Sequence, residues 1–231
     1  MLKVLYEDNH VIAVFKPAGV LSQADVTGDK SIIDQIKRYL KEKYKKPGNV
    51  FLGLVQRLDR PVCGIMLFAK TSKGASRLSE QFRNQQIEKT YQAIVIGRPE
   101  KSRSQSDRGS SMKSGQRGML KNKLIKDEKL HKGREHADGQ EVTLHYEIIK
   151  SNKDHSLLKI KIEGGKFHQI RSQLSLAGFP ILGDIKYGAK EPLVDKSIAL
   201  CATDISFWKA TGEEKITLSI PVPEHWNEFI V

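Results

Sequence analysis

Residues 51–69 read FLGLVQRLDRPVCGIMLFA, in which a short polar segment separates two apolar runs. The runs at 51–55 and 65–69 predict two buried strands, because short apolar runs bounded by turn residues are typical of strands in a sheet interior. The polar segment between them places an arginine on either side of Leu58-Asp59 and is too charged for the core. We therefore expect a polar turn that two buried strands hold in place.

Helices and strands are predicted on both sides of this stretch. Ser31 is a candidate N-cap, and the apolar residues after it recur at helical spacing as far as the lysines before Pro47. Two more helices are predicted at 72–83 and 169–177. Strands are predicted at 3–6, 11–15, 91–96, 142–149, 157–162, 197–205 and 215–220. Because many of these strands are joined by short turns, the predicted fold class is α+β, with a mixed, mainly antiparallel central sheet and flanking helices.

The composition changes between residues 101 and 136. This segment holds eleven lysines or arginines and four aspartates or glutamates, with many serines and glycines and few large apolar residues. Such a composition indicates an irregular, mobile insertion, with a short helix at about 119–127. No clean linker is present elsewhere, so we expect a single domain, residues 1–231, with a basic flexible insertion at about 101–136.

The composition also limits the class of protein. The 231 residues include 39 lysines and arginines and 27 aspartates and glutamates, which gives a formal net charge of +12. This excess of cations indicates a polyanionic partner such as nucleic acid, although a solvated basic loop would give the same charge. No run of about 18 apolar residues is present that would cross a membrane. Cys63 and Cys201 are too few for a disulfide framework, which indicates the cytoplasm.

The first candidate site is Asp59, with Arg57 and Arg60 beside it in the sequence. Two guanidinium groups favour the ionised carboxylate, which suits a nucleophile or a proton acceptor better than a general acid. A salt bridge between arginine and aspartate at a strand end would show the same spacing. Both interpretations stay open at this point.

The second candidate site precedes the predicted helix at 169–177. Gly164 and Gly165 permit a tight turn there. His168 and Arg171 lie three residues apart, so they share a face near the helix start, where a phosphate or a carboxylate would bind. The alternative, slightly favoured by the sequence alone, is a capped helix with solvated polar residues.

The third candidate is Tyr91, at the start of a predicted strand. A tyrosine in this position is most often part of the core or of an interface. The more specific hypothesis is an aromatic platform on which a pyrimidine stacks.

Motifs of several other enzyme classes are absent from the sequence. There is no glycine loop ending in Lys-Ser or Lys-Thr that would hold a phosphate, and no dinucleotide-binding fingerprint. The seven histidines and two cysteines do not have the spacing of zinc ligands. The Gly-x-Ser-x-Gly motif of hydrolases is also missing. We therefore expect neither a metal nor a cofactor.

Together these segments resemble the RluA-type RNA pseudouridine synthases, from about residue 3 to residue 223. Gln56 stands where the family has a histidine, and Phe167 stands where a small polar residue is common. Several motifs in the right order and spacing make the resemblance specific. They are Lys16-Pro17-Ala18-Gly19, Gln56-Arg57-Leu58-Asp59 with Gly64, Lys89-Thr90-Tyr91-Gln92-Ala93, the segment 165–171, Pro180-Ile181-Leu182-Gly183-Asp184, and Tyr187-Gly188.

The resemblance implies the fold class given above with a central RNA-binding cleft, and no separate N-terminal RNA-binding domain. It implies isomerisation of uridine to pseudouridine in ribosomal or transfer RNA, by base flipping and an aspartate-dependent rearrangement of the glycosidic bond. Asp59 would be the catalytic residue, Tyr91 would lie against the uracil, and Arg171 would pair with the Asp59 carboxylate. Arg57 would take the place of the flipped nucleotide. Further candidates for substrate binding are Arg60, His168, Gln169, Ile65 and Leu174.

Two alternatives from other classes stay open. One is a catalytically inactive RNA-binding protein that acts in ribosome assembly. The other is a metal-dependent nuclease that uses Asp59 with Asp184. For the leading hypothesis we expect RNA as the partner, no protein partner, no membrane and a monomer.

Overall fold

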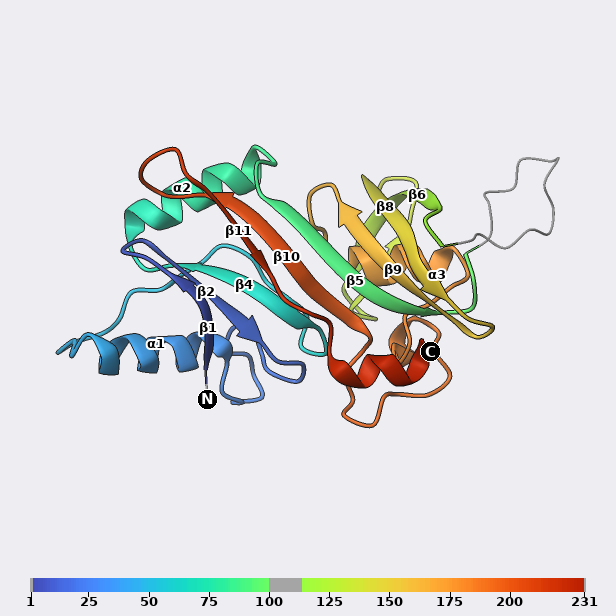
Figure 1. The fold of residues 1–231 in the computed structure, drawn as a ribbon, viewed down its shortest axis with the longest axis horizontal. Coiled ribbons are helices and arrows are strands. Elements are labelled where there is room, and N and C mark those ends of the chain that lie inside the picture. Colours follow the sequence, from blue (N-terminus) through green and yellow to red (C-terminus); the bar gives the residue numbers. More distant parts are fainter. Residues whose placement is uncertain (1, 100–113, 231) are drawn as a thin grey trace. The chain divides into compact units, whose positions relative to one another are not determined.

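The computed structural model describes residues 2–99 and 114–230. The chain divides into two compact units, and it passes from one to the other within β5, within β10 and again after Ile220. The first unit comprises Met1–Lys89 and Ala202–Ile220, and the second comprises Thr90–Cys201 and Pro221–Val231. Figure 1 shows the elements of both units, coloured along the sequence.

The first unit is built on strands in the order β1-β2-β4-β10-β11, with β3 beside β4. The pairs β1–β2, β2–β4, β3–β4 and β10–β11 are antiparallel. Two helices, α1 and α2, belong to the same unit. The elements are β1 (Lys3–Glu7), β2 (Val11–Lys16), α1 (Ile32–Lys43), β3 (Gly53–Leu54), β4 (Cys63–Ala69), α2 (Ser72–Arg83), β10 (Leu200–Trp208) and β11 (Lys215–Ser219).

Strand β4 lies at the centre of this unit, and all seven of its residues are buried. Its side chains at Ile65 and Leu67 pack with Val11 and Ala13 of β2 and with Phe207 of β10 in one apolar cluster. Burial of both faces explains why the strand reads as a continuous apolar run rather than an alternating one. This strand therefore gives the polar turn before it a rigid support.

Both helices of the first unit begin where the sequence predicts. Ser31 caps α1 in a capping box with Asp34, and α1 buries one apolar face. Thr71 accepts a hydrogen bond from the backbone N–H of Gly74 and caps α2. The prediction of a helix at 72–83 is confirmed.

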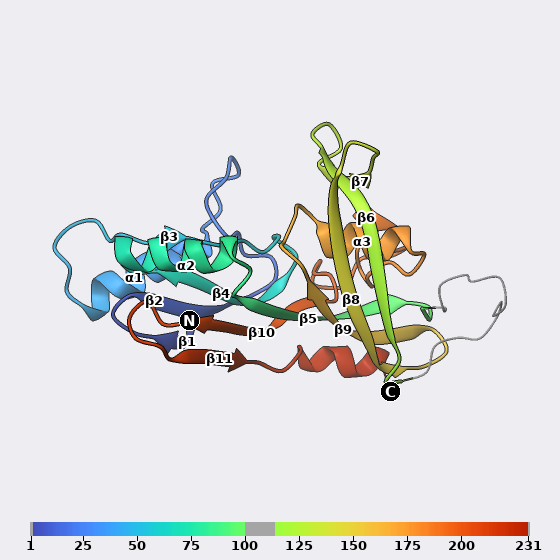
Figure 2. The ribbon, with the colours of Figure 1, turned by 90° about the horizontal axis from the view of Figure 1, so that it is seen from above.

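The second unit contains an antiparallel sheet in the order β5-β9-β8-β6-β7. Helix α3 packs against β6, β7 and β8, and Figure 2 shows it beside them. Two short 3-10 helices complete the unit. The elements are β5 (Glu88–Ile96), β6 (Arg117–Asp127), β7 (Lys132–Glu135), β8 (Gln140–Ser151), β9 (His155–Ile162), α3 (Gln169–Leu176), η1 (Ile185–Tyr187) and η2 (Glu224–Phe229).

The strand predicted at 51–55 is wrong in extent. Only Gly53 and Leu54 pair with β4, and the side chain of Phe51 is 51% exposed. The apolar run continues beyond the residues that the ladder includes, so hydrophobicity alone overestimates the strand.

The interpretation of 101–136 as an irregular insertion is wrong for its described part. Residues 117–127 form β6 and not a helix, and 132–135 form β7. The inward positions of β6 include Gly118 and Asn122 as well as Leu120 and Leu124, so the alternation of apolar residues is hidden. The remainder of the segment, 101–113, lies outside the described residues.

No helix of residues 2–99 and 114–230 is long and apolar enough to cross a bilayer.

Candidate active site

The backbone just before Asp59 is held by the side chain of Ser22. The Ser22 hydroxyl donates to the carbonyl oxygen of Leu58 at 2.6 Å and accepts from the Leu58 N–H at 3.1 Å. Both residues are buried. On the other side, the N–H of Val62 donates to the carbonyl oxygen of Asp59 at 3.0 Å and closes a tight turn. Asp59 therefore stands at the start of a turn that is fixed at both ends.

A buried lysine joins this turn to the segment that follows β2. The Lys16 ammonium is fully buried and donates to the carbonyl oxygens of Pro17, Val20 and Arg60 at 3.0, 2.8 and 3.3 Å. Burial lowers the pKa of Lys16 to about 8, while negative charge at Cys63 and Asp59 raises it. No role for this side chain is predicted from the sequence.

The turn is also tied to Gly19. The N–H of Gly19 donates to the carbonyl oxygen of Arg60 at 2.8 Å, and the Arg60 Nε donates to the carbonyl oxygen of Gly19 at 3.0 Å. The Arg60 Nη2 forms an ion pair with Asp29 at 2.6 Å, at the surface. Arg60 thus has structural partners in this unit, and its predicted role in substrate binding stays a prediction.

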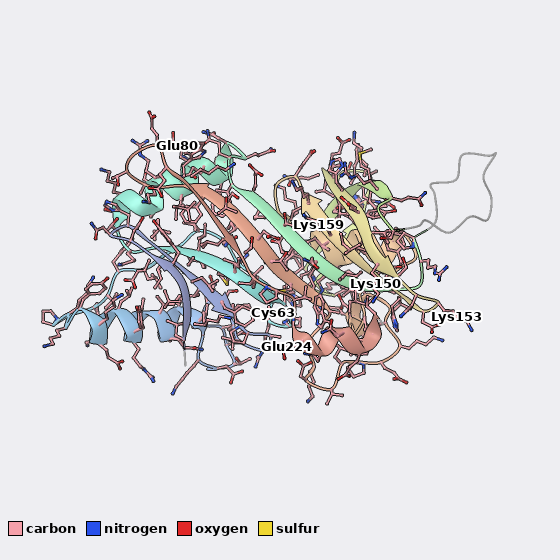
Figure 3. The ribbon with its side chains drawn as sticks, viewed as in Figure 1. Cys63, Glu80, Lys150, Lys153, Lys159 and Glu224 are labelled. Carbon is pink, nitrogen blue, oxygen red and sulfur yellow. The ribbon has the colours of Figure 1, made fainter. Side chains whose placement is uncertain are left out.

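Close contact between strands explains the glycine that follows the turn. Gly64 has a φ of +134°, and a Cβ placed there would lie 2.5 Å from the backbone N and O of Ala202 in β10. Only glycine permits this approach. Figure 3 marks the neighbouring Cys63, the first residue of β4, which is buried.

Arg57 differs from the residues around it. Its side chain is exposed, and within the described residues it has no hydrogen bond or ion pair. An exposed guanidinium directly before a fixed turn is available to an external anion or base. This agrees with the predicted role of Arg57 in contacting RNA but does not test it.

The second predicted segment centres on Arg171 in α3. The Arg171 Nε and Nη2 donate to the two carboxylate oxygens of Asp184 at 2.7 and 2.9 Å. The two side chains are only 6% and 1% exposed. Such a bidentate pair fixes the plane of the guanidinium. The pairing with Asp184 is not predicted from the sequence, and the predicted pairing of Arg171 with Asp59 stays a prediction.

His168 connects this pair to Tyr187. Arg171 Nη1 lies 3.1 Å from His168 Nε2, and His168 Nδ1 lies 2.9 Å from the Tyr187 hydroxyl. Because arginine can only donate, Nε2 must accept, and the proton of the neutral imidazole sits on Nδ1. His168 also stacks on Phe167, with ring centroids 3.9 Å apart. His168 and Arg171 are therefore in direct contact at the start of α3, as their spacing predicts, and the role of His168 in substrate binding stays a prediction.

Gln169 is buried and its amide is used inside the unit. Its Nε2 donates to the carbonyl oxygen of Thr143 at 3.1 Å, and its Oε1 accepts from the N–H of Lys166 at 3.1 Å. Gln173, one turn later, donates to the carbonyl oxygen of Leu120. These bonds give Gln169 a structural role that the sequence analysis did not predict.

The apolar site candidates lie in the interior. Ile65 belongs to the apolar cluster of the first unit, and its role in substrate binding stays a prediction. Leu174 is fully buried in the second unit. Tyr91 lies in β5 opposite Ile160 and is 8% exposed, as the core interpretation expects. Its role as a platform for uracil stays a prediction.

The predicted site residues thus fall into two sets. Asp59, Arg57 and Arg60 belong to the first unit, whereas Tyr91 and Arg171 belong to the second. The pairing of Asp59 with Arg171 stays a prediction. Among the described residues, no three histidine, cysteine, aspartate or glutamate side chains gather where they could hold a metal ion.

Comparison with known proteins identifies the family to which this chain belongs. The family model of RNA pseudouridylate synthase matches residues 10–176. The chain belongs to that family, so its reaction class is the isomerisation of uridine to pseudouridine in RNA. The predicted family and the α+β fold with a mainly antiparallel sheet are confirmed.

Relatives and solved structures agree with this assignment. The chain is 31% identical to the ribosomal large subunit pseudouridine synthase C of Rickettsia prowazekii, across 99% of this chain and 70% of that protein. It is 28% identical to the ribosomal large subunit pseudouridine synthase D of Pseudomonas aeruginosa, across 82% of this chain and 54% of that protein. Human RNA pseudouridylate synthase domain containing 4 has the same fold, with a TM-score of 0.76, 22% identity, and coverage of 97% and 90% of the two chains.

Proposed function

We propose that this chain converts a uridine of structured ribosomal RNA to pseudouridine, with Asp59 as the catalytic carboxylate. The observation that carries the proposal is the turn at Asp59, which Ser22 and Lys16 fix from inside the first unit. A catalytic group must be held in place before its substrate arrives, because positioning supplies much of the rate. The names of the relatives support ribosomal RNA as the substrate, and transfer RNA is the second candidate.

The reaction rearranges atoms within one nucleotide. The bond between N1 and C1′ breaks, the uracil turns, and a bond forms between C5 and C1′. The proton on C5 leaves and N1 gains one, so no atom or electron is gained or lost overall. This chemistry needs an acceptor for a proton and stabilisation of charge, which carboxylate and guanidinium groups supply.

The target nucleotide has to leave its helix first. Its C1′ and the face of its base are out of reach in a stack, and flipping costs a few kcal/mol. We propose that the exposed side chain of Arg57 occupies the space that the base leaves, while Tyr91 lies against the flipped uracil. Arg171 would then pair with the carboxylate of Asp59 and hold it toward the nucleotide.

Affinity for RNA would come from exposed lysines in both units. Helix α1 ends in exposed lysines, and β6 presents Lys121, Lys123 and Lys126 to solvent. The hairpin of β8 and β9 adds exposed Lys150, Lys153 and Lys159, which Figure 3 labels. Contacts of this kind position the RNA without reading its sequence. We expect the chain to act as a monomer in the cytoplasm, where Cys63 and Cys201, which form no disulfide, stay reduced.

The experiment that tests the substrate maps pseudouridines in cellular RNA with and without this gene. We expect the loss of at least one pseudouridine in ribosomal RNA, and its return when the wild-type chain is supplied but not the Asp59→Asn chain. Loss confined to transfer RNA would replace the proposed substrate. An unchanged map in both RNAs would contradict the proposal.

A further inference from the structure

The guanidinium of Arg171 is enclosed by three side chains of its own unit. Asp184 accepts two hydrogen bonds from it, at 2.7 and 2.9 Å, and His168 accepts a third. The ring of Tyr187 lies against it, with the guanidinium carbon 5.0 Å from the ring centroid. Every contact in this set is buried or half-buried.

We propose that Asp184 is a positioning residue that acts through Arg171, setting the plane in which Arg171 meets the reacting groups. The proposal rests on the proposed function, because it assumes that Arg171 takes part in the reaction. Asp184 itself would touch neither RNA nor the reacting atoms. Its contribution would be to stop the guanidinium from rotating or withdrawing.

The backbone of Asp184 is held by hydrogen bonds that do not involve Arg171. Its N–H donates to the carbonyl oxygen of Ile181, and its own carbonyl oxygen accepts from the N–H groups of Tyr187 and Ala189 at 2.9 and 3.1 Å. The preceding Gly183 has a φ of +83°, and a Cβ there would lie 2.8 Å from Leu193. This compact turn therefore gives the Asp184 side chain a fixed point of attachment.

The enclosure also fixes the orientation of the Arg171 guanidinium. Nε and one N–H of Nη2 point to Asp184, and one N–H of Nη1 points to His168. A guanidinium has five N–H groups, so two further donors lie on the terminal nitrogens. The bidentate pair and the Tyr187 ring together fix the plane in which these donors lie. A shift of about 1 Å at a reacting group can cost 100-fold in rate.

Two properties distinguish this role from a purely structural one. A structural residue would change the fraction of folded protein but not the rate of each folded molecule. A positioning residue lowers the single-turnover rate at saturating RNA while the Kd for RNA is kept. Its effect also depends on Arg171, so the two substitutions are not additive.

The test is a double-substitution cycle on the full chain, with a ribosomal RNA transcript as substrate. We expect Asp184→Asn to lower the single-turnover rate about 100-fold and to change the Kd less than threefold. In the Arg171→Lys background, the same substitution should change the rate less than threefold. Asp195→Asn is the matched control, because Asp195 is an exposed carboxylate of the same unit that accepts from the N–H of Ser197. Its rate should stay within twofold of wild type.

The measured rates distinguish failure of this inference from failure of the proposed function. A normal rate for Asp184→Asn, with Asp59→Asn inactive, would overturn only this inference. A normal rate for Arg171→Lys would overturn both this inference and the role of Arg171. If Asp184→Asn does not fold, Asp184→Glu keeps the charge but moves it, and we expect a folded protein with a rate at least tenfold lower. A wild-type rate for that variant would contradict positioning.

Discussion

The hydroxyl of Ser22 binds both backbone groups of Leu58, the residue that precedes Asp59. It donates to the carbonyl oxygen at 2.6 Å and accepts from the N–H at 3.1 Å. One side chain therefore satisfies both backbone hydrogen-bonding groups of Leu58, as a neighbouring strand would in a sheet. The segment keeps a fixed backbone although it is not part of a strand.

Substitution of Ser22 by alanine should destabilise the first unit and slow the reaction. It would leave a buried N–H and a buried carbonyl of Leu58 without partners, at a cost of about 1–3 kcal/mol. The turn would loosen, so we expect the rate at saturating RNA to fall at least tenfold. Denaturant unfolding and single-turnover assays measure the two effects. Ser206→Ala is the control, since Ser206 bonds Thr217 at the surface, and a rate for Ser22→Ala equal to that of the control would refute the role of Ser22.

Lys16 should make stability depend on pH in a particular direction. Burial lowers its pKa from 10.5 to about 8 in the folded chain. Between these two pH values the unfolded chain binds more protons than the folded chain, so the free energy of unfolding rises with pH. The gain from this one group is about 3 kcal/mol when complete.

Comparison of wild type with Lys16→Met at pH 7 and pH 10 isolates this effect, because the other titrating groups contribute equally to both proteins. We expect the wild type to gain stability relative to the variant as the pH rises. Equal changes in the two proteins would show that burial does not lower the pKa of Lys16.

Gly133 in β7 should tolerate no side chain. A Cβ there would lie 2.4 Å from the Ser172 hydroxyl and 3.0 Å from the carbonyl oxygen of Phe167. The N–H of Gly133 also donates to the Tyr187 hydroxyl at 2.6 Å. Gly133→Ala would push β7 away from α3, and we expect a loss of about 1–3 kcal/mol in stability.

The matched control is Gly48→Ala, where nothing lies within 4 Å of an added Cβ. Thermal unfolding of both variants measures the difference. A melting temperature of Gly133→Ala equal to that of the control would show that β7 is not held against α3 in solution.

The sequence predicted much of this fold because local signals were strong. Helix α2 begins and ends at the predicted residues, since Thr71 caps it and one face is apolar. Strand β6 was missed because its inward positions include a glycine and an asparagine, which break the apolar alternation. Local patterns cannot reveal a strand that is stabilised mainly by its neighbours β7 and β8.

The site was predicted less completely because its partners come from distant parts of the chain. Lys16 ends a strand, where a lysine is usually solvated, and its three carbonyl partners become apparent only in the fold. The pair of Arg171 and Asp184 spans thirteen residues and depends on the turn after α3. For Ile65 the sequence cannot distinguish core from site, because β4 is buried on both faces and its apolar run does not show which way each side chain points.

The most direct measurement of the central claim is the yield of pseudouridine in a ribosomal RNA transcript incubated with purified wild-type or Asp59→Asn protein. Asparagine keeps the shape of the side chain but cannot accept a proton or act as a nucleophile as a carboxylate does. We expect pseudouridine with the wild type and none with the variant, while both bind the RNA with a Kd within about threefold. Pseudouridine formed by the variant at the wild-type rate would contradict the role of Asp59.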